Sequence, residues 1–431
     1  MKPQLSQHFL SRQPSAIRLA LISFAKRTDG VKSVNAAIGN VSLPMHPALQ
    51  KRMFNLKDYY KDGVLKYSST VGSEETQKAF LNIIASSGFD TKKLYVQITD
   101  GGSKAMDLLV AGLCGPAGIK KKPLLLIDPA YTNYKTMAER MGRSVISVKR
   151  KLDDNGEFTL PSIDKIEAVI KKHKPSGILA IPYDNPTGQF FDMETMVKLG
   201  ELVVKHNIWL ATDEAYRELQ YTSQKTSSIW GLNESNCPGI TGRRISIESA
   251  SKVWNACGLR MGAIITDNQD FNEKSIADAT ATLCPNVIGQ YIFGALAHEK
   301  HSDLKKWYEK QRNYYQKMIS RFRKELLDLV PGIIVSKPDA ALYSVVDVKN
   351  IVNKSFKAKD FALYCAAKGK VKLKGGYYTL LVSPMSGFYS CEKGEENPGR
   401  TQMRIAYVET PENLEKGPVL LQRLLRQYLK K

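Results

Sequence analysis

Five short apolar stretches of this sequence are each followed at once by polar, glycine-rich or aromatic residues. These follow-on segments are 100–105 (DGGSKA), 128–131 (DPAY), 182–188 (PYDNPTG), 213–216 (DEAY) and 249–252 (SASK). Ammonium, carboxylate, hydroxyl and amide groups are the side chains that bind small polar molecules and move protons on them. In an open α/β sheet, ligands bind in the crevice beyond the carboxyl ends of the strands. If the stretches are strands of one sheet, the sequence predicts one small-molecule site.

Each segment also has a simpler structural interpretation. A Gly-Gly-Ser before a helix is commonly a turn with an N-cap, and Asn185-Pro-Thr-Gly188 is a good turn sequence. Asp213 could cap a helix, and Lys252 could be an ordinary solvated lysine. The joint spacing and the shared end of the predicted sheet favour the functional interpretation.

The stretches themselves predict the elements that position these residues. Nearly continuous apolar runs, expected for strands buried on both faces, occur at Tyr95–Thr99, Leu124–Ile127, Ser144–Val148, Gly177–Ile181, Trp209–Asp213, Arg244–Ser249 and Gly262–Thr266. Helical periodicity lies between them, for example at Ser103–Gly112 and Met193–His206. This alternation predicts an α/β fold with a mostly parallel seven-stranded sheet sandwiched by helices.

The pattern changes after residue 286. Residues 286–330 are predicted to form one long helical stretch broken near His301–Asp303. Short mixed elements follow at Gly332–Val335, Ala341–Val346, Phe361–Lys368, Thr379–Val382 and Met403–Val408, and a basic amphipathic helix at Leu414–Lys430. Residues 368–400 are rich in Gly, Lys and Glu and are expected to contain an exposed loop.

These elements predict two domains. We expect a large α/β domain over residues 51–295 and a smaller α+β domain over residues 296–431. Residues 1–50 would form an N-terminal arm and part of the smaller domain.

Taken jointly, the segments resemble the class I/II aminotransferases, which are pyridoxal-phosphate enzymes of fold type I. The resemblance covers the chain from about Pro14 to Tyr407. The family motifs match Asn185-Pro-Thr-Gly188, then Asp213 and Tyr216, then Ser249, Ser251 and Lys252 followed by Arg260, and finally the late carboxylate-binding arginine at Arg404.

The resemblance implies a role for each matched residue. Lys252 would form an aldimine with pyridoxal 5'-phosphate and act as the catalytic base and acid. Asp213 would keep the pyridine nitrogen protonated, while Asn185 and Tyr216 would hydrogen-bond the phenolic oxygen of the cofactor. Arg404 would bind the substrate's α-carboxylate in a bidentate manner.

The resemblance also implies a phosphate site and a stacking residue. The phosphate would lie at the start of a helix, bound by Gly102, Ser103 and Lys104, because free N–H groups and the helix dipole favour an anion there. The remaining phosphate contacts would be Ser249, Ser251 and Arg260. Tyr131 would lie against the ring face of the cofactor.

Two further matches concern the substrate and a second subunit. Gly39, in Val34-Asn-Ala-Ala-Ile-Gly39, resembles the glycine whose backbone touches the substrate carboxylate in the family. Tyr67 resembles the tyrosine that reaches the phosphate in the neighbouring subunit, which implies a homodimer with shared active sites; a simply packed tyrosine is the alternative. The chain departs from the family in Pro338-Asp-Ala-Ala-Leu-Tyr343, where glycine is common.

The function implied by the resemblance is amino transfer from an L-amino acid to a 2-oxo acid. A pyridoxal-phosphate C–S β-lyase of the same fold would need the same lysine, aspartate and arginine, so it stays as an alternative. If the substrate has a second carboxylate on its side chain, Arg18 and Lys104 are the only nearby candidates to bind it. A nucleic-acid-binding regulator with an aminotransferase-like sensor domain is the remote alternative.

The amino-acid composition excludes several classes of protein and of binding partner. The 431 residues carry 63 Lys+Arg against 42 Asp+Glu, a formal charge of +21, and 43% are hydrophobic, which excludes a disordered, collagenous or coiled-coil chain. Because the excess charge lies mainly on lysine-rich helical segments, we expect solvated faces and no nucleic-acid partner. No apolar run is long enough to span a bilayer, so no membrane partner is expected.

Cysteine usage and the N-terminus bear on location. Six scattered cysteines show no metal-site spacing and favour a reducing compartment, so we expect a cytoplasmic protein without a metal site. Residues 1–28 contain no Asp or Glu, as transit peptides do. Pro14–Lys26 is nevertheless predicted to be an ordinary amphipathic helix.

Overall fold

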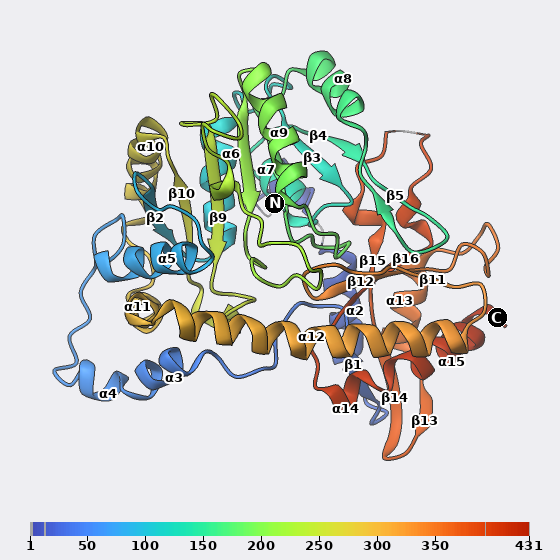
Figure 1. The fold of residues 1–431 in the computed structure, drawn as a ribbon. Helices are drawn as coiled ribbons and strands as arrows, with labels where there is room; N and C mark the ends of the chain where they lie inside the picture. The colour runs from blue at the N-terminus through green and yellow to red at the C-terminus, as the bar shows by residue number, and fades with distance from the viewer. Residues whose placement is uncertain (1–2, 13, 393, 431) are drawn as a thin grey trace.

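A seven-stranded sheet forms the centre of the molecule (Figure 1). The computed structural model describes residues 3–12, 14–392 and 394–430; the first two residues of the acid-free N-terminal stretch and the last residue of the chain lie outside them. The order is β2-β10-β9-β8-β7-β3-β4, and only β10 runs antiparallel to its neighbours. The bounds are β2 (Tyr95–Thr99), β3 (Leu124–Asp128), β4 (Val145–Lys149), β7 (Gly177–Ala180), β8 (Trp209–Asp213), β9 (Arg244–Ser249) and β10 (Gly262–Thr266).

Both faces of this sheet are buried, which explains its nearly continuous apolar strands. In β3, Leu125 and Ile127 pack into one hydrophobic core, whereas Leu124 and Leu126 pack into a second core. Because side chains alternate across a strand, the two cores lie on opposite faces of the sheet. The predicted α/β class and the mostly parallel sheet are confirmed.

Helices cover the two faces and connect the strands. They are α5 (Glu74–Ser86), α6 (Gly102–Leu113), α7 (Asn133–Arg140), α8 (Ile163–His173), α9 (Met193–Lys205) and α10 (Gln269–Ala279). Helix α6 packs on β9 and β10, while α9 packs on β8 and α8 packs on β4. A short hairpin of β5 (Lys151–Leu152) and β6 (Phe158–Thr159) follows β4.

One long helix crosses the molecule below the sheet (Figure 1). It is α12 (His301–Leu329), and it follows α11 (Val287–Gly294). Its buried side chains recur every three or four residues from Leu304 to Leu326, which gives one apolar face along the whole helix. The prediction of a break at His301–Asp303 was wrong by a few residues, because α12 begins at His301 and Asp303 lies in its first turn. An acidic residue is favourable there, beside the positive end of the helix dipole.

The chain after α12, together with one N-terminal strand, builds two smaller sheets. One has the order β11-β12-β16-β15 and the other β1-β14-β13. Their bounds are β11 (Ile334–Val335), β12 (Tyr343–Asp347), β15 (Ser383–Pro384), β16 (Gln402–Ala406), β13 (Val371–Leu373), β14 (Gly376–Leu381) and β1 (Lys32–Asn35). The helices of this region are α13 (Ala358–Ala367), α14 (Pro411–Leu414) and α15 (Gly417–Leu429).

The N-terminal segment lies beside these later elements (Figure 1). β1 pairs in parallel with β14, and α2 (Ala16–Ala25) packs against α13. The predicted helix near Pro14–Lys26 is therefore α2, with Ser15 as its N-cap. Upstream lies α1 (Gln7–Leu10), while α3 (Pro47–Phe54) and α4 (Leu56–Tyr59) form an extension at the far end of the molecule.

The segment 368–400 is more ordered than its composition suggested. It contributes β13, β14 and β15 to the smaller sheets. Among its described residues, exposure is concentrated at the hairpin turn 372–377 and at 392–398, so it does contain an exposed loop.

Candidate active site

A cavity of about 280 Å³ opens where the strands of the large sheet end. It brings together all but two of the residues predicted from the sequence. Those that line it are Gly39, Gly102, Ser103, Tyr131, Asn185, Asp213, Tyr216, Ser249, Ser251, Lys252, Arg260 and Arg404. The residues come from the ends of several strands and from the β16 strand of a smaller sheet, so the predicted single site exists as a geometric unit.

Lys252 lies in the loop after β9. The Ser249 hydroxyl donates to the Ser251 hydroxyl at 2.8 Å and accepts from the Ser251 amide at 3.1 Å, which makes a tight turn before the lysine. The Lys252 ammonium contacts the carbonyl oxygen of Gly39. Among the described residues, no carboxylate lies within ion-pair distance of Lys252. The amine therefore faces the cavity without an anionic partner.

Asp213 ends β8 and is held from two sides. Its Oδ1 accepts from the Ala215 amide at 3.0 Å, and the hydroxyl of Tyr134 donates to its Oδ2. Burial, partly offset by these hydrogen bonds, raises the pKa of Asp213 above its usual range. A cation placed against Asp213 would reverse that shift, because an opposite charge favours the ionised carboxylate. Tyr134 was not singled out in the sequence, although it lies three residues after the predicted Tyr131.

Asn185 connects the guanidinium of Arg404 to the phenol of Tyr216. Arg404 Nη1 donates to Asn185 Oδ1 at 2.9 Å, and Asn185 Nδ2 donates to the Tyr216 oxygen at 3.4 Å. Arg404 Nη2 donates to the carbonyl of Ala37 at 2.6 Å. Arg404 is only 3% exposed, and its Nε has no hydrogen-bond partner within the described chain.

A glycine-rich turn brings backbone close to Arg260. Gly101 has φ of +81°, a conformation that favours glycine, and a Cβ built on it would lie 2.5 Å from Arg260 Nη2, so the glycine lets the guanidinium approach the backbone closely. Helix α6 begins at Gly102, next to Ser249. Arg260 is exposed to the cavity, and its one side-chain hydrogen bond in the described residues is to the carbonyl of Cys257 at 3.0 Å. A free guanidinium beside a helix N-terminus is suited to a phosphate.

These groups fit pyridoxal phosphate as a set. The cavity combines a half-buried carboxylate, an amine and two guanidinium groups, and within the described residues none of these four side chains forms an ion pair. For Arg404, which is 3% exposed, the absence of a partner costs free energy, because buried charges are normally paired. A molecule with a phosphate, a basic ring nitrogen and a carbonyl carbon would complement Arg260, Asp213 and Lys252.

Two predicted residues do not line the cavity. Lys104 lies in the first turn of α6 but is absent from the lining, and Tyr67 is 78% exposed on the surface. Of the two candidates for a distal carboxylate, only Arg18 of α2 lines the cavity. Tyr343 lines it as well, although the sequence offered only the alanine-for-glycine departure beside it. Ala341 in that segment has φ of +59°, a left-handed conformation that glycine adopts more readily.

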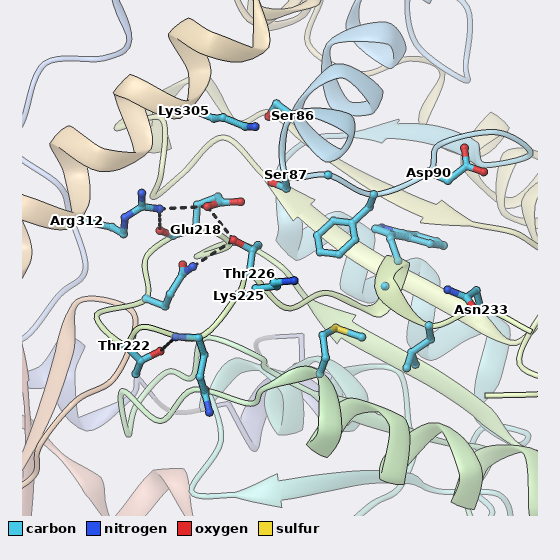
Figure 2. A pocket seen from close by; sticks show the side chains of 18 of the residues that line it. Ser86, Ser87, Asp90, Glu218, Thr222, Lys225, Thr226, Asn233, Lys305 and Arg312 are labelled. Carbon is cyan, nitrogen blue, oxygen red and sulfur yellow. Dashed lines mark hydrogen bonds and ion pairs between the residues drawn. The ribbon is translucent and has the colours of Figure 1, made fainter. Parts of the chain in front are cut away.

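A second cavity of about 1250 Å³ lies behind the segment that follows Tyr216. Figure 2 shows Arg312 of α12 pointing toward Glu218, with Thr226 beside it; both side chains donate to Glu218 Oε2 at 3.1 Å. Glu218 has φ of +77°, so these contacts hold a strained residue two positions after Tyr216. No residue predicted from the family motifs lines this cavity, and we interpret its contacts as support for the loop after β8.

Comparison with known proteins identifies the family. The family model described as aminotransferase class I and II matches residues 34–416. The chain belongs to this family. It is therefore an aminotransferase, and the predicted resemblance and enzyme class are confirmed. The nucleic-acid-binding alternative is not supported.

Individual relatives are distant and differ in their named substrates. An aspartate aminotransferase of Sulfurisphaera tokodaii is 24% identical over 387 residues, covering 88% of this chain and 90% of the relative. Aromatic-amino-acid aminotransferase 2 of Thermococcus litoralis is 22% identical over 436 residues, covering 98% of each chain. An alanine aminotransferase structure from Pyrococcus furiosus superposes with a TM-score of 0.80 at 21% identity, covering 98% of this chain and 100% of the other. At this identity the structural likeness shows the fold alone.

Proposed function

We propose that this aminotransferase binds pyridoxal 5'-phosphate in the cavity around Lys252 and uses it to transfer an amino group from an L-amino acid to a 2-oxo acid. The observation that carries the proposal is the convergence of Lys252, Asp213 and Arg404, three charged side chains without ion-pair partners in the described residues, on one cavity. Asp213 would bind the ring nitrogen of the cofactor, Arg404 would bind the α-carboxylate of the substrate, and Lys252 would move the proton on the α-carbon.

The cofactor would be held by residues from five chain segments. Asp213 would hold a proton on the ring nitrogen, and Tyr216 with Asn185 would hydrogen-bond the phenolic oxygen. Tyr131 would cover one ring face. The phosphate would be bound by Arg260 and the start of α6 at Gly102 and Ser103, together with Ser249 and Ser251. Lys104 does not line the cavity, and its backbone N–H donates to the Gly101 carbonyl at 3.1 Å, so we assign Lys104 no direct contact with the phosphate.

Two side chains would act on the substrate. Arg404 would bind the α-carboxylate with its two terminal nitrogens and so fix the direction of the bond from the α-carbon to hydrogen. Lys252 would take that proton and return it, as general base and then acid. The bound cofactor would supply a ring that withdraws electrons from the α-carbon. Gly39 accepts a hydrogen bond from Lys252 and borders the same space.

The substrate's side chain would face α2. Ile17 and Arg18 of this helix line the cavity together with Ile38. This wall is both apolar and cationic, and it does not single out one amino acid. The proposed chemistry therefore concerns the shared α-amino and α-carboxylate groups, for which Arg404 and Lys252 suffice.

We further propose a homodimer in which Tyr67 completes the partner's phosphate site. The support is a run of exposed apolar side chains in one segment: Phe54, Tyr59, Val64, Leu65 and Tyr67 are between 54% and 78% exposed. An exposed apolar patch of this kind marks an interaction surface. We also propose that residues 51–295, which contain the seven-stranded sheet, form the cofactor-binding domain, and that residues 296–431, with part of 1–50, form the smaller domain.

A cytoplasmic location is also proposed. Its support is that all six cysteines are free, including three that are buried and close to no other cysteine in disulfide geometry. No helix among the described residues is long and apolar enough to cross a membrane.

Product analysis tests the proposed reaction. Protein supplied with pyridoxal phosphate, a panel of amino acids and a 2-oxo acid should form a new amino acid and a new oxo acid in equal amounts. The Lys252→Ala variant should form neither. Release of ammonia and an oxo acid without an acceptor would indicate a lyase and contradict amino transfer.

A further inference from the structure

Tyr343 enters the active-site cavity from a different sheet than the predicted cofactor residues. It is the first residue of β12, where it pairs with Ala406 of β16, and its side chain is only 1% exposed. Two positions along, Val345 pairs with Arg404. The strand pairing therefore places Tyr343 and Arg404 on adjacent strands, from which both side chains reach the cavity.

The Tyr343 hydroxyl lies among groups that the reaction would use. It is 2.8 Å from the hydroxyl of Tyr216. A Cβ built on Gly39 would lie 2.5 Å from the Tyr343 hydroxyl and 3.0 Å from Lys252 Nζ, so both groups approach the same backbone atom. The Arg404 guanidinium lies over the Tyr343 ring, with its carbon 4.5 Å from the ring centre.

Either phenol could donate in this bond, and we assign the donor from the partners within the protein. Among the described residues, Tyr216 is the only hydrogen-bond partner of the Tyr343 hydroxyl. A buried hydroxyl with one partner avoids an unsatisfied proton by donating to that partner. The Tyr216 oxygen then accepts from Tyr343 and, at 3.4 Å, from Asn185 Nδ2. Both acceptor positions of this oxygen are occupied, so the proton of Tyr216 must be donated elsewhere.

The remaining direction for that proton is the cavity. Burial raises the pKa of the Tyr216 phenol well above its usual range, so Tyr216 is a neutral hydrogen-bond donor. A hydroxyl that accepts a hydrogen bond also becomes a stronger donor, because bonds in a chain polarise one another.

We propose that Tyr343 is a positioning residue that donates to Tyr216, directs the Tyr216 proton into the cavity and strengthens its hydrogen bond to the phenolic oxygen of the bound cofactor. This role rests on the proposed binding of pyridoxal phosphate around Lys252. The ring of Tyr343 packs under Arg404 and edge-on against the Tyr216 ring, with centroids 5.7 Å apart, whereas its hydroxyl makes the hydrogen bond to the Tyr216 hydroxyl.

The Tyr343→Phe variant separates these contacts because it keeps the ring and removes the hydroxyl. A hydrogen bond to the phenolic oxygen stabilises its deprotonated form, so weakening that bond should raise the pKa at which the visible absorption band of the loaded protein titrates. We expect an upward shift of about 0.5 to 1 pH unit, the size expected when one neighbouring hydrogen bond is weakened. The measurement is a spectrophotometric pH titration without substrate.

Four further variants make the result specific. Tyr216→Phe should raise the same pKa by more, and adding Tyr343→Phe to it should produce no further shift, because the effect passes through Tyr216. Tyr407→Phe is the matched control: Tyr407 is also buried, and its hydroxyl lies 2.7 Å from that of Ser344 on the same sheet, away from the cavity. It should leave the pKa unchanged. Tyr343→Met, which also lacks a donor, should reproduce the shift if the Phe variant loads poorly.

Two outcomes would overturn the inference. One is an unchanged pKa in loaded Tyr343→Phe and Tyr343→Met. The other is a shift of equal size when Tyr343→Phe is placed in the Tyr216→Phe background, which would show that Tyr343 acts independently of Tyr216. A wild-type protein that develops no visible band with pyridoxal phosphate would instead overturn the proposed function, and the two failures are thus distinguishable.

Discussion

The guanidinium group of Arg404 donates a hydrogen bond to the side-chain oxygen of Asn185 at 2.9 Å, although 219 residues separate them in the sequence. This contact joins β16 of a smaller sheet to the loop after β7 of the large sheet. Arg404 is buried and lacks a carboxylate partner in the described residues, so its charge is available for a bound carboxylate.

Arg404→Lys should weaken substrate binding while keeping the positive charge. Lysine cannot make the bidentate pair of hydrogen bonds that a guanidinium group makes with a carboxylate. We expect kcat/KM to fall about a hundredfold, which is the effect of losing one charge-assisted hydrogen bond. Steady-state kinetics with a saturating oxo acid measures it. Arg400→Lys, four residues away and bonded to the carbonyl groups of Lys354 and Phe356, is the control and should stay near wild type. Equal losses in both variants would contradict the assignment.

Asp213→Asn should reduce kcat by a hundredfold or more, since an amide cannot hold a proton on a ring nitrogen as a carboxylate does. Tyr134→Phe removes the hydroxyl that donates to Asp213 Oδ2 and should cost about tenfold. Tyr183→Phe removes an equally buried hydroxyl, which donates to the Ser227 carbonyl at 3.1 Å outside the cavity, and should leave kcat unchanged. Wild-type turnover in Asp213→Asn would refute its proposed role.

Substituting charged residues into the exposed apolar segment should dissociate the proposed dimer into monomers. Val64 and Leu65 are 57% and 54% exposed, and a Val64→Asp/Leu65→Asp variant would place two carboxylates in the interface. Light scattering after gel filtration should give the mass of two chains for wild type and of one chain for the variant. Leu429→Asp, which changes an exposed apolar residue of α15, should remain dimeric. A monomeric wild type would exclude the shared site with Tyr67.

Stability should fall on mild acidification because His46 is buried. Burial lowers the pKa of His46 to about 4, although Asp303 acts in the opposite direction. The unfolded chain, with a histidine pKa of about 6.5, then binds more protons than the folded protein between pH 6.5 and 4. This group therefore costs up to about 1.4 kcal/mol of stability for each pH unit lost within that window.

The His46→Asn variant tests that expectation. His46 caps α3 by accepting from the Ala48 amide at 3.2 Å, and asparagine can replace this acceptor without taking up a proton. The drop in thermal midpoint from pH 7 to pH 5 should be smaller in His46→Asn than in wild type. His173→Asn, at the exposed end of α8, should behave like wild type. Equal drops in all three proteins would show that His46 does not control the acid sensitivity.

The large sheet was predictable because its strands are buried on both faces. The bounds of β2, β8, β9 and β10 match the apolar runs residue for residue, and the residues after each strand were therefore placed at the correct edge. Because Asn185, Asp213 and Lys252 follow strands that end at that edge of the sheet, their grouping in one cavity could be predicted.

What could not be predicted depends on contacts between distant parts of the chain. The Tyr134 hydroxyl reaches Asp213 across 79 residues, and the Tyr343 hydroxyl reaches Tyr216 across 127 residues. An isolated tyrosine in a sequence more often packs than bonds a functional group, so neither had a local signal. The parallel pairing of β1 with β14 is equally non-local, because parallel partners are set by the fold and not by a turn.

The proposed amino transfer is tested most sharply by the visible spectrum of the protein loaded with pyridoxal phosphate, titrated with amino acids and then with 2-oxo acids. We expect a visible band that at least one amino acid abolishes and a 2-oxo acid restores, with no such cycle in Lys252→Ala. A band that no amino acid changes, or a complete cycle in Lys252→Ala, would contradict it.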